Sequence, residues 1–161
     1  MSTFTEKDCA YMAHALRLAE RGRFSAHPNP VVGCVLVKDD TIVGEGWHQR
    51  TGAAHAEVNA LQSAGSEALG ATAYITLEPC AHHGKTPPCA DALVRARVAR
   101  VVVAMIDPNP LVAGKGLARL TEAGITVEQG LMADVAASLN RGFLKRVSAG
   151  RPFVRLKVAC S

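Results

Sequence analysis

The spacing of apolar residues changes along the chain between the period of a helix and the pattern of a strand. Residues 6–22 carry apolar side chains at helical spacing, and Gly22 ends the pattern. The run VVGCVLV (31–37) is continuous, apolar and rich in β-branched residues, which is typical of a buried strand. It is separated only by the Asp39-Asp40 pair from TIVGEGWH (41–48), so the two runs predict an antiparallel hairpin.

Beyond the hairpin, helical and strand patterns alternate. The patterns predict helices at 55–65, 87–97, 116–124 and about 131–142, and strands at 71–77, 100–106 and 125–130. Such alternation makes the later strands parallel and places helices on both faces of the sheet. The predicted fold class is α/β, a three-layer α/β/α sandwich with a mixed five-stranded sheet.

The end of the chain departs from this pattern. RPFVRLKVACS (151–161) is another apolar, β-rich run, and it follows Ala149-Gly150 when the first domain already has its elements. We therefore expect residues 1–146 to form one domain, and residues 147–161 to be a linker and the first strand of a second domain that is otherwise absent.

Composition narrows the functional classes. With 161 residues and 48% hydrophobic content, the chain can bury a core without disulfides, and five cysteines without a secretory segment favour a reduced, cytoplasmic protein. Aromatic content of 4% leaves little surface for stacking nucleic-acid bases, and no stretch has the length of a membrane span.

The distribution of charged residues also argues against a nucleic-acid partner. The formal net charge is +4, but six of the 18 basic residues follow Asp134, after which there is no acid, so the preceding part has 12 basic and 14 acidic residues and a net charge of −2. A basic tail of this kind is typical of a solvated face or an inter-domain contact. We expect neither a nucleic-acid nor a membrane partner.

The first group of residues with chemical potential is His55-Ala56-Glu57, at the start of a predicted helix. His55 can offer an imidazole nitrogen to a metal, while Glu57, about 200° further round the helix, stays free to carry protons. Taken alone, the pattern equally fits a polar cap followed by an acid that the helix dipole favours.

The second group is TLEPCAHHGKTPPC (76–89), in which Cys80 follows a strand and Cys89 lies in the first turn of the next predicted helix. Two thiolates and one imidazole suit tetrahedral zinc and leave its fourth position open for a water, which favours catalysis over a structural role. The alternatives are unrelated buried thiols, or a closed structural site in which His82 or His83 is the fourth ligand.

Together these groups match the zinc nucleobase deaminases, in which His-x-Glu is followed by Pro-Cys and a second Cys. Eight residues separate Cys80 from Cys89, where most of these enzymes have two. With HPNPVVG (27–33) and DPNPLVAGKG (107–116), the chain from its first helix to about residue 145 resembles the deaminase domain of the RibD family of bifunctional riboflavin-biosynthesis proteins.

This resemblance implies a cytidine deaminase-like fold with one Zn²⁺ per chain, held by His55, Cys80 and Cys89. The implied reaction is the hydrolytic deamination of 2,5-diamino-6-ribosylamino-4(3H)-pyrimidinone 5′-phosphate to 5-amino-6-ribosylaminouracil 5′-phosphate and ammonia. Glu57 would pass a proton from water to the ring nitrogen and a second one to the departing amine. Residues 151–161 resemble the start of the family's NADPH-dependent reductase domain, so NADPH is implied only for a longer chain, and family members are often homo-oligomers.

By the same resemblance, a set of polar residues would contact the pyrimidine ribotide. From the residues alone, each also fits a turn or a strand end, and two of them fit the DPNP turn. The loop between the cysteines offers cationic groups that could meet a phosphate. The expected substrate-binding residues are Asn29, His48, His82, Lys85, Asp107 and Asn109.

Two further interpretations, a phosphate-binding loop and a deaminase of another base, fit the sequence less well. The string Ala113-Gly114-Lys115-Gly116 invites a phosphate-loop reading, but Asn109 and Gly116 stand where a Walker motif needs a glycine and a Ser or Thr. A deaminase acting on guanine, cytosine or adenosine in transfer RNA is disfavoured by the long loop between the cysteines and by the lack of a basic, aromatic surface.

Overall fold

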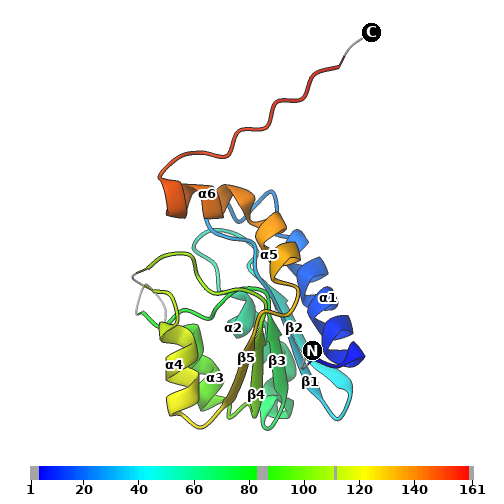
Figure 1. Cartoon of the computed structure of the whole chain (residues 1–161). Coiled ribbons are helices and arrows are strands. Elements are labelled where there is room, and N and C mark those ends of the chain that lie inside the picture. Colours follow the sequence, from blue (N-terminus) through cyan, green and yellow to red (C-terminus); the bar gives the residue numbers. More distant parts are fainter. Residues whose placement is uncertain (1–3, 83–86, 111, 160–161) are drawn as a thin grey trace.

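The sheet is five-stranded and mixed, as predicted. The computed structural model describes residues 4–82, 87–110 and 112–159, and its strands lie in the order β2-β1-β3-β4-β5 (Figure 1). β1 is antiparallel to both its neighbours, whereas β3, β4 and β5 are parallel. The strands are β1 (Gly33–Lys38), β2 (Thr41–Trp47), β3 (Thr72–Ile75), β4 (Arg100–Val103) and β5 (Thr126–Gln129).

Helices cover both faces of this sheet. α2, α3 and α4 lie on one face, and α1 and α5 lie on the other (Figure 1). Successive residues of a strand point to opposite faces, so Ile75 packs in the first layer and its neighbour Tyr74 in the second. The three-layer sandwich is thus confirmed. The helices are α1 (Glu6–Glu20), α2 (Ala56–Ala64), α3 (Cys89–Arg95), α4 (Lys115–Glu122), α5 (Ala133–Leu139) and α6 (Arg141–Ala149), with a 3₁₀ turn at Gly65–Ala68.

The predicted hairpin forms at the Asp39-Asp40 pair. Both residues have positive φ, +48° and +61°, as a two-residue type I′ turn requires. β2 then approaches α2 closely because Gly46 has no side chain: a Cβ there would lie 2.3 Å from the carbonyl oxygen of Ala56. The hairpin therefore packs directly against the first turn of α2.

The prediction of a single helix at about 131–142 was wrong, because two helices occupy this region. α5 ends at Leu139 and α6 begins at Arg141. Asn140 lies between them, buried, and its side chain accepts a hydrogen bond from the Val31 N–H (2.8 Å) and donates one to the Val31 carbonyl (3.0 Å). These bonds tie the junction to the entrance of β1 and turn the chain.

The C-terminal segment extends away from the sandwich (Figure 1). Residues 151–159 are exposed and lie in no helix or strand. A strand needs a neighbour to satisfy its N–H and C=O groups, and the described chain offers none here. That this segment begins a second domain stays a prediction.

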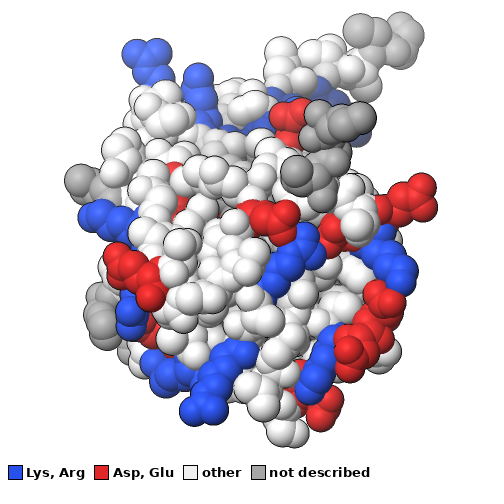
Figure 2. Space-filling model, turned by 60° about the horizontal axis from the view of Figure 1, so that its bottom comes forward, with Lys and Arg blue, Asp and Glu red and all other residues white. Residues whose placement is uncertain are grey.

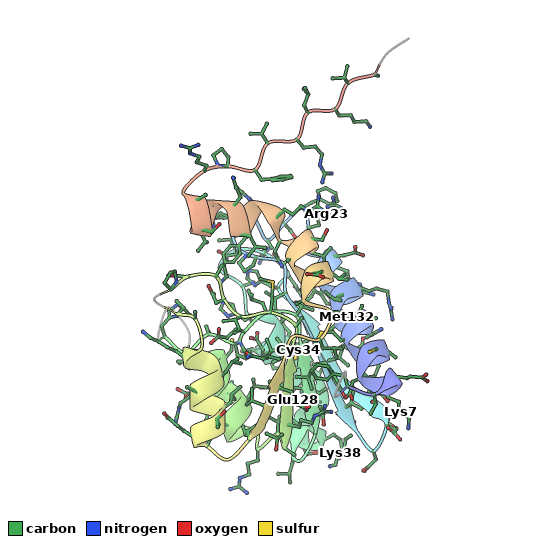
Figure 3. All side chains as sticks on the ribbon, in the orientation of Figure 1. Lys7, Arg23, Cys34, Lys38, Glu128 and Met132 are labelled. Carbon is green, nitrogen blue, oxygen red and sulfur yellow. The ribbon has the colours of Figure 1, made fainter. Side chains whose placement is uncertain are left out.

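Basic and acidic side chains are interspersed on the face that Figure 2 turns forward. Lys7 pairs with Asp40 at 2.6 Å and Lys38 with Glu67 at 3.5 Å; both lysines lie at the end of the sheet opposite the C-terminal segment (Figure 3). Among the described residues, no helix is long and apolar enough to cross a membrane.

A buried carboxylate joins α1 to the sheet. Asp8 accepts hydrogen bonds from the Tyr74 hydroxyl and the Arg100 guanidinium, both at 2.7 Å, and from the backbone and hydroxyl of Thr5. Burial alone would raise the pKa of Asp8, but the hydrogen bonds from Arg100, Thr5 and Tyr74 outweigh it and hold the pKa well below its usual range.

We predict that Asp8→Asn lowers the free energy of unfolding by about 2 kcal/mol at neutral pH, since it removes charge-assisted hydrogen bonds from a buried group. Because the pKa is lowered in the folded state, this stabilisation is complete above the unfolded pKa of about 3.9 and is lost as the pH falls below it. Urea unfolding should therefore show wild type and variant converging between about pH 5 and pH 2.

The matched control is Asp40→Asn, at an exposed carboxylate in the exposed pair with Lys7. It should change stability little at either pH. Equal effects of the two substitutions, or a difference for Asp8→Asn that does not depend on pH, would contradict the role given to Asp8.

Candidate active site

Three segments far apart in the sequence meet at the carboxyl ends of β3 and β4. His55 is the N-cap of α2, and Glu57 lies in the first turn of that helix. Cys80 follows β3, and Cys89 is the first residue of α3. In an α/β sheet, the loops at this edge are where ligands usually bind.

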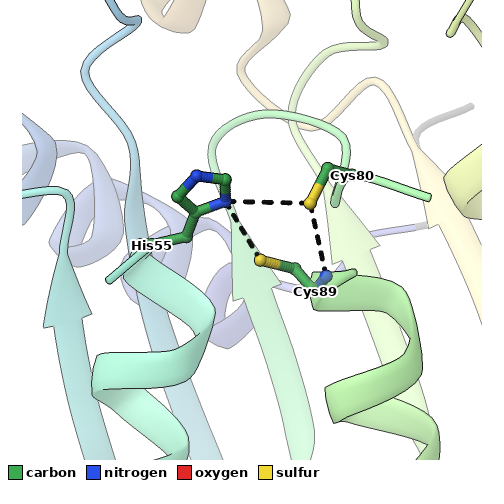
Figure 4. Close-up of side chains that lie close together, drawn as sticks. All are labelled: His55, Cys80 and Cys89. Atoms are coloured by element: carbon green, nitrogen blue, oxygen red, sulfur yellow. Dashed lines mark hydrogen bonds between the residues drawn. The ribbon is translucent and has the colours of Figure 1, made fainter. Parts of the chain in front are cut away.

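The side chains of His55, Cys80 and Cys89 face one another (Figure 4). The Nδ1 atom of His55 lies 3.2 Å from the Cys89 sulfur and 3.7 Å from the Cys80 sulfur, and all three donor atoms lie within 4.8 Å of one another. The Cys89 N–H also donates to the Cys80 sulfur at 3.3 Å. The side chains predicted to hold the metal are thus brought together, close enough for one ion to contact all three.

This arrangement fits zinc in both distance and chemistry. Zn–S bonds of about 2.3 Å and Zn–N bonds of about 2.0 Å in a tetrahedron separate the donor atoms by roughly 3.5–3.8 Å. A hydrogen bond from Cys89 lowers the pKa of Cys80, and His55 contributes in the same direction. One thiol is therefore poised to be a thiolate, the form that binds metals.

Glu57 lies beside the group but is not one of its members. Its carboxyl is buried, with 3% of its surface exposed. Burial raises the pKa of Glu57 to about 7, although the neighbouring His55 opposes the shift. A carboxyl with such a pKa can both accept and release a proton near neutral pH.

A cavity of about 250 Å³ opens over these groups. Four of the six predicted substrate-binding residues line it together with Glu57 and two of the candidate metal ligands. Its lining residues are Asn29, Pro30, Val32, His48, His55, Glu57, Leu77, Glu78, Cys80, His82, Asp107 and Phe143.

Asn29 and His48 form a pair in the wall of this cavity. His48 is buried, and its Nδ1 donates to the Ala54 carbonyl at 3.2 Å, because a carbonyl can only accept. Its Nε2 is then the acceptor for the Asn29 side-chain amide at 3.1 Å. Burial lowers the pKa of His48, which favours this neutral form.

Of the other two predicted substrate residues, the structure describes Asn109 alone. The Asn109 N–H donates to the Asp107 carboxylate at 2.8 Å, so Asn109 contributes to the DPNP turn, and it is not among the described residues that line the cavity. Lys85, like His83, lies outside the described residues. His82 lines the cavity but does not join the metal-ligand group, which has three members in the part of the chain that the structure describes.

Sequence reasoning missed several residues of the wall. Phe143 lines the cavity and comes from α6, the helix that follows the junction at Asn140, and nothing in the local pattern indicates this junction. Glu78 was overlooked although it stands in the TLEPC string: an acid at the end of a buried strand, between apolar residues and Pro79, was a signal that could have been used.

Comparison with known proteins agrees with this geometry. A family model described as the cytidine and deoxycytidylate deaminase zinc-binding region matches residues 5–105. The chain is 64% identical over 155 residues to the riboflavin biosynthesis protein RibD of Escherichia coli, covering 96% of this chain and 42% of that protein. The Acinetobacter baumannii RibD structure (form 2) superposes with a TM-score of 0.93 at 61% identity, covering 95% of this chain and 43% of that one.

The chain therefore spans less than half the length of these RibD proteins. It matches nearly all of a shorter relative, the diaminohydroxyphosphoribosylamino-pyrimidine deaminase of Buchnera aphidicola subsp. Schizaphis graminum, at 51% identity over 91% of this chain and 99% of that protein. The chain thus belongs to the cytidine and deoxycytidylate deaminase family and, within it, to the riboflavin-biosynthesis deaminases that include RibD.

Proposed function

We propose that this chain hydrolyses 2,5-diamino-6-ribosylamino-4(3H)-pyrimidinone 5′-phosphate to 5-amino-6-ribosylaminouracil 5′-phosphate and ammonia. The observation that carries this is the convergence of His55, Cys80 and Cys89 beside the buried Glu57 in one cavity. The shorter relative, named for this pyrimidine deaminase activity and matched over 99% of its length, supports the choice of substrate.

The metal ligands in this proposal are His55, Cys80 and Cys89, with one Zn²⁺ per chain. When bound there, zinc would supply the Lewis-acid chemistry that makes water nucleophilic near neutral pH. Among the described residues the group has three protein donors, which would leave one coordination position for that water.

Glu57 is the proton carrier in this mechanism. Its carboxylate takes a proton from the attacking water and delivers it to the ring nitrogen next to the carbon that bears the 2-amino group. The water oxygen bonds to that carbon. Glu57 then passes the remaining proton of the resulting hydroxyl to the 2-amino group, the bond between the carbon and that nitrogen breaks, ammonia leaves and the oxygen stays as the new carbonyl. Burial, which raises the pKa of Glu57 to about 7, suits both steps.

The cavity wall offers matching groups for the substrate. The Asn29 amide, oriented by His48, presents donor and acceptor atoms to a pyrimidine edge, and Asp107 lies on the same wall. We assign the 5′-phosphate to the loop between the cysteines, through His82 and Lys85. We propose that Asn109 acts on the site indirectly, through the DPNP turn that it forms with Asp107.

The wider setting is also part of the proposal. Residues 1–146 form the deaminase unit and 147–161 lead into a reductase domain, for which NADPH would be the cofactor; relatives more than twice as long support this. Thiols at Cys9, Cys34, Cys80 and Cys89, all without a disulfide, support a cytoplasmic protein. We further propose a homo-oligomer that acts on a small molecule and not on nucleic acid.

The proposed ligands predict the metal content of variants. Cys80→Ser and Cys89→Ser should each reduce bound zinc from about one ion per chain to well below half, because a hydroxyl replaces a thiolate ligand. Elemental analysis of purified protein measures this. Cys9→Ser, at an exposed cysteine on α1, is the matched control and should keep the full amount; full zinc in both ligand variants would refute the site.

If Glu57 is the proton carrier, its replacement should lower turnover without lowering zinc binding. Glu57→Gln should keep its zinc and lower kcat by roughly 10²–10⁴-fold, because the amide cannot shuttle protons. Ammonia release together with elemental analysis tests this, with Glu67→Gln on the 3₁₀ turn as the control. If Glu57→Gln turned over normally, the mechanism would be wrong, and if neither wild type nor variant reacted, a structural zinc site would be the better interpretation.

The substrate assignment predicts a clear order of reactivity. Ammonia release from the diaminopyrimidinone ribotide should exceed that from guanine, cytidine and deoxycytidylate, and removing the 5′-phosphate should raise KM by about tenfold or more, because a charge-assisted contact is lost. Steady-state assays with these five compounds measure it. Equal or better turnover of the compound without phosphate contradicts the assignment.

A further inference from the structure

Besides Glu57, the active site contains a second buried carboxylate, which lies between the metal-ligand group and the loop that follows β4. Glu78 comes two residues before Cys80 and has only 5% of its surface exposed. Its carboxylate accepts three backbone hydrogen bonds, from the N–H groups of Asp107 (3.1 Å), Gly114 (3.0 Å) and Gly116 (2.9 Å). The mechanism above does not use it.

The three donors include the start of α4. Gly114 is the N-cap of this helix, in the left-handed conformation, and it has no side chain to satisfy the free N–H groups of the first turn. The Glu78 carboxylate takes that place from another segment, where the positive end of the helix dipole favours it. The glycine-rich string that looks like a phosphate loop thus surrounds an anion of the protein itself.

Glycine is required for this approach. A Cβ on Gly116 would lie 1.9 Å from the carbonyl oxygen of Pro79, so α4 begins in direct contact with the backbone just before Cys80. The Glu78 N–H also donates to the Met105 carbonyl at 2.9 Å. Backbone and side chain of Glu78 therefore join the segment after β3 to the segment after β4.

Both segments contribute to the cavity wall, with Cys80 on one and Asp107 on the other. We propose that Glu78 is a positioning residue that holds Asp107 at the substrate wall, at a fixed distance from the metal-ligand group. The inference rests on the proposed function, because the substrate that Asp107 meets is the one proposed there.

The variant that tests this is Glu78→Gln, which keeps the size of the side chain but turns an NH₂ group toward at least one backbone N–H. Amide hydrogen exchange at Asp107, Gly114 and Gly116 should become faster, because two donors then face each other. KM for the ribotide should rise roughly tenfold while kcat changes by less than about threefold, and zinc content should stay at that of wild type.

Asp91→Asn is the matched control. Asp91 pairs with Arg119 at 2.8 Å and also links α3 to α4, but it does not line the cavity. It should leave KM, kcat and the exchange of the three amides unchanged. A rise in KM of the same size in Asp91→Asn would show that general loosening of α4 is the cause and would overturn the proposal.

A double variant separates positioning from a general effect on the site. If Glu78 acts through Asp107, adding Glu78→Gln to Asp107→Ala should change KM by less than about twofold. Multiplying effects, or an unchanged KM in Glu78→Gln alone, would overturn the proposal. So would failure of both Glu78→Gln and Glu78→Asp to fold, since Glu78 would then be a determinant of stability only.

The outcomes also distinguish this inference from the proposed function. Absence of ammonia release from the wild-type protein would contradict the proposed function, whereas the amide-exchange comparison would still test the contacts of Glu78. Normal turnover of wild type with unchanged KM and unchanged exchange in Glu78→Gln would contradict the inference alone.

Discussion

The site depends on one geometrical constraint: an imidazole and two sulfurs from three segments must reach a single point at one edge of the sheet. Their donor atoms lie within 4.8 Å of one another. His55 reaches this point because Gly46 lets α2 lie close against β2, and Cys80 reaches it because it lies in the segment that leaves the end of β3. The packing of helices on the sheet thus brings the three ligand side chains together. A glycine at the contact between β2 and α2 allows this packing.

Much of this was predictable, because the informative signals were local. The Asp39-Asp40 pair predicted the hairpin, since only a two-residue turn separates its strands, and the alternation of periods predicted a mixed sheet with helices on both faces. The convergence of His55, Cys80 and Cys89 followed from placing them at the same edge of that sheet. The chemistry of the ligand types then indicated zinc.

The unpredicted parts depend on contacts between residues distant in sequence. The pattern of residues 131–142 gives one helix, but the chain breaks because Asn140 binds the backbone of Val31, more than a hundred positions earlier. Phe143, which lines the cavity, lies on the helix that follows that break. No propensity or spacing encodes such a bond, because its partner is a backbone group with no sequence signal of its own.

Three helices begin at this edge of the sheet, and each has an acidic group or a thiol at its first turn. Glu57 lies in the first turn of α2, the first N–H of α3 donates to the Cys80 sulfur, and the first turn of α4 holds Glu78. Helix N-termini favour negative charge, so the fold offsets part of the cost of gathering thiolates and carboxylates in a buried place. The backbone N–H groups with which these helices begin therefore contribute to the electrostatic environment of the site.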